Sequence, residues 1–164
     1  MAIKIGDKLP SGTLTEMTNN GPQNFPVEEL TKNKRVVIFG LPGAFTPTCS
    51  AKHVPGYVSL ADTLKASKID EIICVSVNDA YVMGAWAKDQ NAAGKVRMLA
   101  DGSAAFTKAL GLEVDLTARG MGIRSQRYSM LVDNGMVKAL NVETPGKFEV
   151  SNAETMAEQV QKLK

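Results

Sequence analysis

The chain has 164 residues, of which 44% are hydrophobic and 22% are charged, and its formal net charge is +2 at pH 7. This size and balance predict a single soluble globular domain over residues 1–164. The small net charge and the lack of a Lys/Arg block argue against nucleic-acid binding. The longest mostly apolar run, residues 36–45, is too short to span a bilayer and contains Pro42, so we expect no membrane segment.

The cysteine count predicts a reducing compartment. Only Cys49 and Cys74 are present, which argues against a disulfide scaffold and favours a catalytic or redox role for any special cysteine. The first residues, MAIKIGDKLPSGTL, lack the apolar segment of a secretory signal. We therefore expect a cytoplasmic protein.

The first half of the chain predicts a hairpin, two strands and a helix. Residues 3–30 mix short apolar pairs with Gly, Pro and Asn, which indicates an irregular segment or a hairpin. Residues 35–40, RVVIFG, predict a buried strand. Apolar residues recur at helical spacing over residues 48–66, where Pro55 should kink the helix. Residues 71–79, EIICVSVND, are typical of a strand covered on both faces.

The second half continues this alternation. We expect a helix over residues 80–91, a strand over residues 96–101 and a helix over residues 103–112 that closes at Gly111. Two strands within residues 127–143 meet at an Asn-Gly pair, a strong hairpin signal. A capping box, Ser151 to Glu154, should open a C-terminal helix. The order predicts an α/β protein with a mixed central β-sheet and helices on both faces, the plan of a thioredoxin-like fold.

The segment GLPGAFTPTCSAKH, residues 40–53, contains Cys49 and the only histidine, His53. Cys49 should lie in the first turn of a helix, beyond the carboxyl end of a strand, where open α/β sheets form their sites. The unpaired N–H groups and partial positive charge of a helix N-terminus stabilise a thiolate. These features favour a nucleophilic Cys49 over a buried, inert one. A metal site from Cys49, His53 and Cys74 would lack a fourth ligand, so we expect none.

The residues around Cys49 resemble a known family. PGAFTPTC, residues 42–49, resembles the P-x-x-x-[TS]-x-x-C motif of the peroxiredoxins, and SAKHVPGYV is similar to the type II, or type-five, subfamily. ICVSVNDAYVMGAWAKD, LADG and SQRYSMLVDNG extend the resemblance in the same order over nearly the whole chain. The resemblance implies a thiol-dependent peroxidase that reduces hydrogen peroxide and organic hydroperoxides without a cofactor.

The same resemblance implies roles for individual residues. Cys49 would be the peroxidatic nucleophile, which becomes a sulfenic acid. Thr46 would hold the peroxide and steady the thiolate by hydrogen bonds, and Pro42 would shield the thiolate from water. Arg127 would bind the thiolate and the developing oxyanion, with Arg124 as the weaker alternative.

Two residues keep two interpretations each. His53 lies four residues after Cys49 and shares its helix face, so it either joins the pocket or packs locally. Cys74 is either a small core residue or the resolving partner that the resemblance to plant-like members implies. A disulfide needs Cα atoms within about 7 Å, and a residue in the centre of a strand is expected to lie farther than that from a helix N-terminus. We therefore favour reduction of Cys49 by an external thiol, either glutaredoxin with glutathione or thioredoxin, with Cys74 auxiliary.

Apolar residues beside the site predict a further contact. Leu41, Gly43, Ala44 and Phe45 either cover the pocket within the monomer or pack against a second subunit. The resemblance implies a homodimer. An alternative function, a peroxide-sensing redox relay, would use the same cysteine, and it differs from a peroxidase because it saturates after one equivalent of peroxide.

Overall fold

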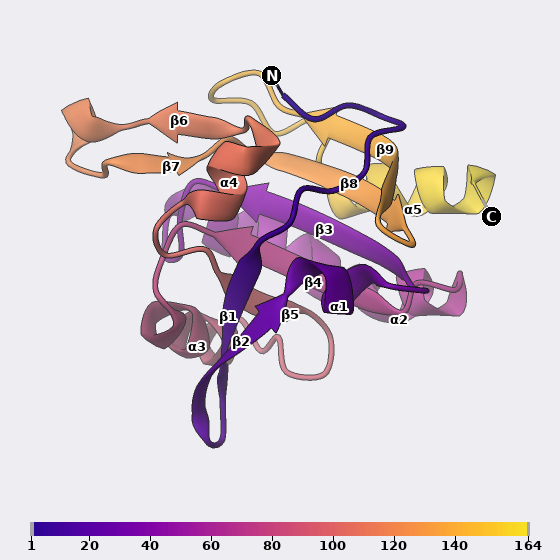
Figure 1. Cartoon of the computed structure of the whole chain (residues 1–164), viewed down its shortest axis with the longest axis horizontal. Helices are drawn as coiled ribbons and strands as arrows, with labels where there is room; N and C mark the ends of the chain where they lie inside the picture. Colours follow the sequence, from indigo (N-terminus) through magenta and orange to yellow (C-terminus); the bar gives the residue numbers. More distant parts are fainter. Residues whose placement is uncertain (1, 164) are drawn as a thin grey trace.

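The computed structural model describes residues 2–163, and its central feature is a seven-stranded mixed β-sheet (Figure 1). The strands lie across the sheet in the order β2 (Gly21–Pro26), β1 (Thr13–Thr18), β5 (Arg97–Ala100), β4 (Glu71–Ser76), β3 (Arg35–Leu41), β8 (Tyr128–Asp133) and β9 (Met136–Val142). β3, β4 and β5 pair in parallel, whereas the other neighbours are antiparallel. The predicted mixed sheet is confirmed.

Helices cover both faces of this sheet. They are α1 (Val27–Thr31), α2 (Val54–Ala66), α3 (Ala80–Asp89), α4 (Ala105–Leu110) and α5 (Ala153–Lys162). Because side chains alternate along a strand, Val37 and Phe39 of β3 join a core with α2, α3 and α5, whereas Val36 and Ile38 join a core with α1 and α4. Figure 1 shows α1 and α4 in front of the sheet. The α/β, thioredoxin-like prediction is therefore confirmed.

The helix that carries Cys49 has an unusual first turn. The helical stretch begins at Pro47, passes through a π-helical turn over Cys49–His53, called the π-turn below, and continues as α2. The backbone N–H of Val54 donates to the carbonyl of Cys49, five residues back. Pro55 lies in the first turn of α2 and has no N–H to donate to the carbonyl of Ala51. The irregularity expected at Pro55 thus takes the form of a π-turn just before it.

The turn and hairpin predictions are confirmed. β1 and β2 form the N-terminal hairpin. Asn134 and Gly135, which join β8 to β9, have φ angles of 48° and 81°, in the left-handed region that an Asn-Gly turn supplies. Gly111 ends α4 with a φ of 71°.

Two details predicted from the sequence are wrong. The strand expected over residues 71–79 ends at Ser76, because the carboxylate of Asp79 instead caps α3 by accepting a hydrogen bond from the N–H of Val82. The expected capping box does not form: α5 has Asn152 as its N-cap, and the Ser151 hydroxyl donates to the carboxylate of Glu143. The Ser151 hydroxyl, which the sequence pattern assigned to the start of the helix, is therefore bonded to Glu143 instead.

A second, two-stranded sheet was not predicted. It consists of β6 (Glu113–Asp115) and β7 (Ile123–Ser125), and the chain enters β8 directly after it. This small sheet projects to one side of the molecule in Figure 1. Within residues 2–163, no helix combines the length and apolar character needed to cross a membrane.

Candidate active site

Cys49 is the third residue of its helical stretch and is fully buried, at 0% exposure. Its Sγ accepts a hydrogen bond of 3.2 Å from Nη2 of Arg127, which precedes β8. Full burial would also suit an inert core cysteine, so exposure does not separate the two interpretations made from the sequence. The charged hydrogen-bond donor does separate them, because an inert core cysteine has apolar neighbours, whereas this sulfur accepts a hydrogen bond from a guanidinium.

Arg127 holds two partners with one guanidinium group. Its Nη1 lies 3.0 Å from Nδ1 of His53, and the ring of Phe148 lies below the guanidinium at 5.8 Å. Arg124, the other candidate, points elsewhere: its Nη1 donates to the carbonyl of Pro42 over 3.2 Å. Arg127 is thus the arginine that the fold brings to Cys49.

His53 is buried between aromatic rings and is bonded through both of its ring nitrogens. Nδ1 faces Arg127, and Nε2 lies 3.1 Å from the carbonyl oxygen of Ser151. The rings of Phe39 and Phe148 lie 4.9 and 5.1 Å away, centre to centre. Burial, and then the charge of Arg127, lowers the pKa of His53 to about 3. The imidazole is therefore neutral at pH 7 and a weak base.

The loop between β3 and the π-turn is held in place by polar contacts. The hydroxyl of Thr46 donates to the carbonyl of Gly43 over 2.7 Å, and the N–H of Ala44 donates to Oδ1 of Asn78 over 2.9 Å. A Cβ atom at Gly43 would lie 2.5 Å from Nη1 of Arg124, so a side chain here would displace the Arg124 guanidinium. These contacts hold Thr46 directly before Pro47, where the helix that carries Cys49 begins, while Pro42 directly follows β3.

Phe45 stands out in this loop. Its side chain is 54% exposed, its φ angle is 64°, and its ring lies 6.3 Å from that of Trp86. A bulky residue in the left-handed region costs about 1–3 kcal/mol. The loop therefore presents an aromatic ring to solvent at an energetic cost, while Leu41 and Gly43 are buried.

Cys74 lies in the centre of the sheet. It is on β4, beside Phe39 of β3 and Met98 of β5, and it is fully buried. Burial, together with the nearby Cys49, raises the pKa of its thiol well above the usual value. Both cysteines are free thiols in this structure.

Three residues of the site were missed in the sequence. Phe148 and Ser151 lie on the loop between β9 and α5, and Glu143 begins that loop. The carboxylate of Glu143 is buried and accepts hydrogen bonds from the N–H groups of Glu149, Val150 and Ser151. The only local signal was an acid directly after a strand, followed by the turn residues TPG.

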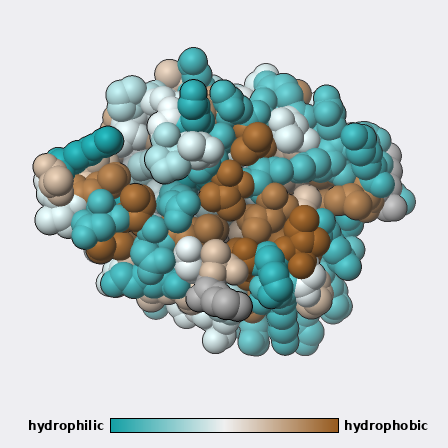
Figure 2. All heavy atoms as spheres, turned by 90° about the horizontal axis from the view of Figure 1, so that it is seen from above, coloured by the Kyte–Doolittle hydropathy of each residue, from teal (hydrophilic) through white to brown (hydrophobic). Residues whose placement is uncertain are grey.

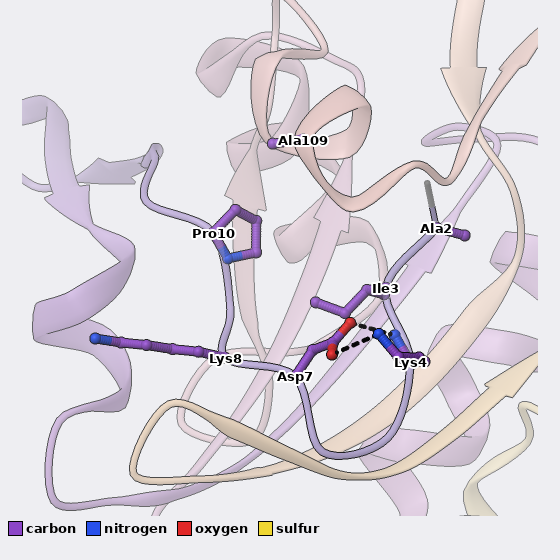
Figure 3. Close-up of a pocket in the computed structure, with 7 residues that line it drawn as sticks. All are labelled: Ala2, Ile3, Lys4, Asp7, Lys8, Pro10 and Ala109. Atoms are coloured by element: carbon purple, nitrogen blue, oxygen red, sulfur yellow. Dashed lines mark hydrogen bonds and ion pairs between the residues drawn. The ribbon is translucent and has the colours of Figure 1, made fainter.

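The structure gives no place for the metal site considered from the sequence. Both nitrogens of His53 are already hydrogen-bonded, and within residues 2–163 no group of three or more His, Cys, Asp or Glu side chains is placed to hold an ion. A surface hollow is lined by Ile3, Lys4 and Asp7 among others, and Figure 3 shows the carboxylate of Asp7 bonded to Lys4 there. It contains none of the predicted site residues.

Comparison with known proteins identifies the family. The Redoxin family model matches residues 4–157. Peroxiredoxin-2D of Arabidopsis thaliana is 49% identical over 153 residues, which cover 93% of this chain and 94% of that protein. The crystal structure of reduced Prx3 of Vibrio vulnificus in complex with H2O2 is 56% identical, with a TM-score of 0.93 and coverage of 96% and 99% of the two chains.

One similar structure carries a different description. A protein of Burkholderia cenocepacia described as a thioredoxin reductase is 61% identical, with a TM-score of 0.95 and coverage of 96% of this chain and 98% of that one. This chain has no G-x-G-x-x-G dinucleotide motif, so that description does not transfer to it. With the Redoxin match and the peroxiredoxin-2 relatives, the chain belongs to the peroxiredoxin family, type II, whose members are thiol-dependent peroxidases.

Proposed function

We propose that Cys49 is the peroxidatic cysteine of this enzyme and that Arg127 is its main electrostatic partner. The observation that carries the proposal is the 3.2 Å hydrogen bond from Nη2 of Arg127 to Sγ of the buried Cys49. The thiolate attacks one peroxide oxygen, so that an S–O bond forms while the O–O bond breaks. Sulfur is oxidised to a sulfenic acid, and the leaving oxygen takes up a proton as water or an alcohol. The guanidinium stabilises the charge as it moves from sulfur to oxygen.

Thr46 and Pro42 complete the proposed pocket. The Thr46 hydroxyl directs its proton to the carbonyl of Gly43, so its remaining hydrogen-bonding capacity is that of an acceptor. An acceptor suits the O–H group of hydrogen peroxide or of an organic hydroperoxide. The proposed role of Thr46 is therefore limited to the peroxide and does not include the bond to the thiolate expected from the resemblance. Pro42 has no N–H, and its carbonyl is taken by Arg124, so its apolar ring is the part left to shield the thiolate from water.

The test is replacement of the nucleophile. We expect Cys49→Ser to abolish turnover of both hydrogen peroxide and an organic hydroperoxide with excess thiol reductant, because a serine hydroxyl is not ionised at neutral pH. Cys74→Ser is the matched control, since it changes the other cysteine in the same way. Retained turnover in Cys49→Ser would refute the proposal. The redox-relay alternative predicts that even the wild type stops after one equivalent of peroxide.

An external thiol is the proposed reductant of oxidised Cys49. Cys74 lies in the central strand β4, paired on both sides and fully buried, so a disulfide with Cys49 would require part of the sheet to open. Glutaredoxin with glutathione, or thioredoxin, would instead approach the end of the sheet where the π-turn lies.

A homodimer is proposed through the Phe45 loop. Phe45 is 54% exposed and Tyr81, at the start of α3, is 69% exposed, and burial of such rings is a typical driving force for association. Figure 2 shows hydrophobic residues gathered in a band across one face, so apolar surface alone does not locate the contact. Among the exposed large apolar side chains of residues 2–163, Phe45 is the one with a φ angle in the left-handed region, which favours its loop as the contact.

We expect Phe45→Glu to convert a dimer into a monomer in sedimentation velocity, because a carboxylate cannot be buried without a partner. Ile5→Glu is the matched control, since Ile5 is 61% exposed and lies outside the site. A wild type that is monomeric throughout, or dissociation by Ile5→Glu alone, would contradict this assignment.

A further inference from the structure

The hydrogen bonds of His53 allow only one protonation state. The carbonyl oxygen of Ser151 is an acceptor, so the Nε2 atom 3.1 Å from it carries the ring proton. The guanidinium of Arg127 has only donors, so the Nδ1 atom 3.0 Å from its Nη1 carries a lone pair. A doubly protonated ring would turn an N–H group against a cation. The neutral Nε2–H form is the one that satisfies both partners.

The Ser151 carbonyl that selects this form is itself held firmly. It also accepts a hydrogen bond of 2.9 Å from the hydroxyl of Tyr57. The N–H and hydroxyl groups of Ser151 donate to Oε2 of Glu143 over 2.8 and 2.7 Å. The backbone N–H of Glu143 in turn donates to the carbonyl of Arg127 over 2.9 Å. Glu143 therefore ties the loop that carries Ser151 to the backbone of Arg127.

The burial of Glu143 does not weaken this connection. Desolvation alone would raise the pKa of its carboxyl, but the hydrogen bonds from Glu149, Ser151 and Val150 together lower it. The carboxylate is ionised at neutral pH and accepts bonds only, as this arrangement requires. The chain of contacts from Glu143 through Ser151 and His53 to Arg127 thus has a fixed direction of donation at every step.

We propose that His53 and Glu143 are positioning residues for the reaction at Cys49. The Nδ1 lone pair of His53 fixes one end of the Arg127 guanidinium, so that the other end points at Sγ. Glu143 fixes the loop carbonyl that orients the His53 ring. The inference rests on the proposed function, because it assigns Arg127 to the thiolate. A free arginine side chain has many rotamers, and a second anchor point restricts it to the one that reaches sulfur.

Three substitutions of His53 separate positioning from packing. The amide oxygen of His53→Asn can replace the Nδ1 acceptor, the amide N–H of His53→Gln can replace the Nε2 donor, and His53→Leu replaces neither while filling the space. We expect oxidation of Cys49 by hydrogen peroxide to slow about 10- to 100-fold in His53→Leu and His53→Gln, the range that loss of a charge-assisted hydrogen bond predicts. His53→Asn should recover most of the rate.

The rate is measured in a single turnover without a reductant. Trp86 is the only tryptophan, and its Nε1 donates to Oγ of Ser50, the residue after Cys49, so its fluorescence reports on the site. The rate is recorded as a function of pH in each variant. We expect the rate to fall at every pH in His53→Leu and His53→Gln and to be recovered in His53→Asn, a pattern that a loss of packing would not produce.

Glu143→Gln tests the second step and keeps the proposal falsifiable if a His53 variant does not fold. We expect Glu143→Gln alone to slow the oxidation of Cys49. Added to His53→Leu, it should slow oxidation little further, because both residues act on Arg127 through the same chain of contacts. A wild-type rate in Glu143→Gln, additive effects in the double variant, or a wild-type rate in His53→Leu would overturn the positioning proposal alone, provided that Arg127→Ala is slow. A wild-type rate in Arg127→Ala would overturn the proposed role of Arg127, and the positioning proposal with it.

Discussion

Residues of the same type in this chain are distinguished by the groups that they contact. Arg124 and Arg127 are three positions apart, yet one is on β7 and binds the loop carbonyl of Pro42, while the other precedes β8 and binds Cys49. The motif around Cys49 was readable because its residues are contiguous. The choice between the two arginines needed the resemblance or the fold, since both are positive charges beside a short strand.

Cys74 differs from Cys49 in the same way. Its neighbours on β3 and β5 are apolar, and burial raises the pKa of its thiol. We expect Cys74→Ala to keep turnover with both glutaredoxin plus glutathione and thioredoxin. It should lose about 1 kcal/mol of unfolding free energy from the small cavity that it leaves. Turnover is compared for the two reductants, and stability is measured by urea unfolding.

The outcome of this comparison assigns Cys74. A loss of turnover with thioredoxin alone would identify Cys74 as a resolving cysteine and contradict the external-thiol proposal. A matching loss with both reductants would point to damage of the fold, and the unfolding curve would show that directly.

At the level of elements, regular patterns were predictable and long-range contacts were not. The central strands, α3 and the Asn-Gly hairpin followed from periodicity and turn chemistry. β6 and β7 have only three residues each, too few for a periodic pattern. The capping box failed because the acceptor of the Ser151 hydroxyl, Glu143, lies eight positions earlier and belongs to the site.

The π-turn is the element whose geometry bears most directly on the site. It contains Cys49 at one end and His53 at the other, and one guanidinium contacts both. In Pro55→Ala the new N–H can donate to the carbonyl of Ala51 in the α-helical pattern. We expect the turn to tighten, the two side chains to shift relative to Arg127, and turnover to fall by up to about 100-fold, with no loss of thermal stability.

Gly56→Ala is the matched control for Pro55→Ala. Its Cβ would meet Ala153 at an ordinary 3.6 Å, and it alters helix propensity without adding a new hydrogen-bond donor. Wild-type turnover in Pro55→Ala would show that the π-turn is not required. An equal fall in Gly56→Ala would assign the effect to the packing of α2 against α5.

At the scale of the whole molecule, the site joins three distant segments. The π-turn, Arg127 and the loop before α5 are linked by hydrogen bonds between residues that are 74 to 98 positions apart. The family resemblance predicted that Arg127 would reach Cys49, but the third segment left no motif. Folding must bring all three segments together. Because they meet at His53, the protonation of His53 is coupled to the free energy of unfolding.

This coupling predicts how stability depends on pH. His53 has a pKa of about 3 in the folded protein and about 6.5 when unfolded, so between these values the unfolded chain binds the extra proton. Stability is therefore complete above about pH 6.5 and falls as the pH is lowered towards 3. From pH 7.5 to 5 we expect urea unfolding to show a loss of about 2 kcal/mol. Because His53 is the only histidine, His53→Asn should remove most of this slope, and an unchanged slope in that variant would contradict the assignment.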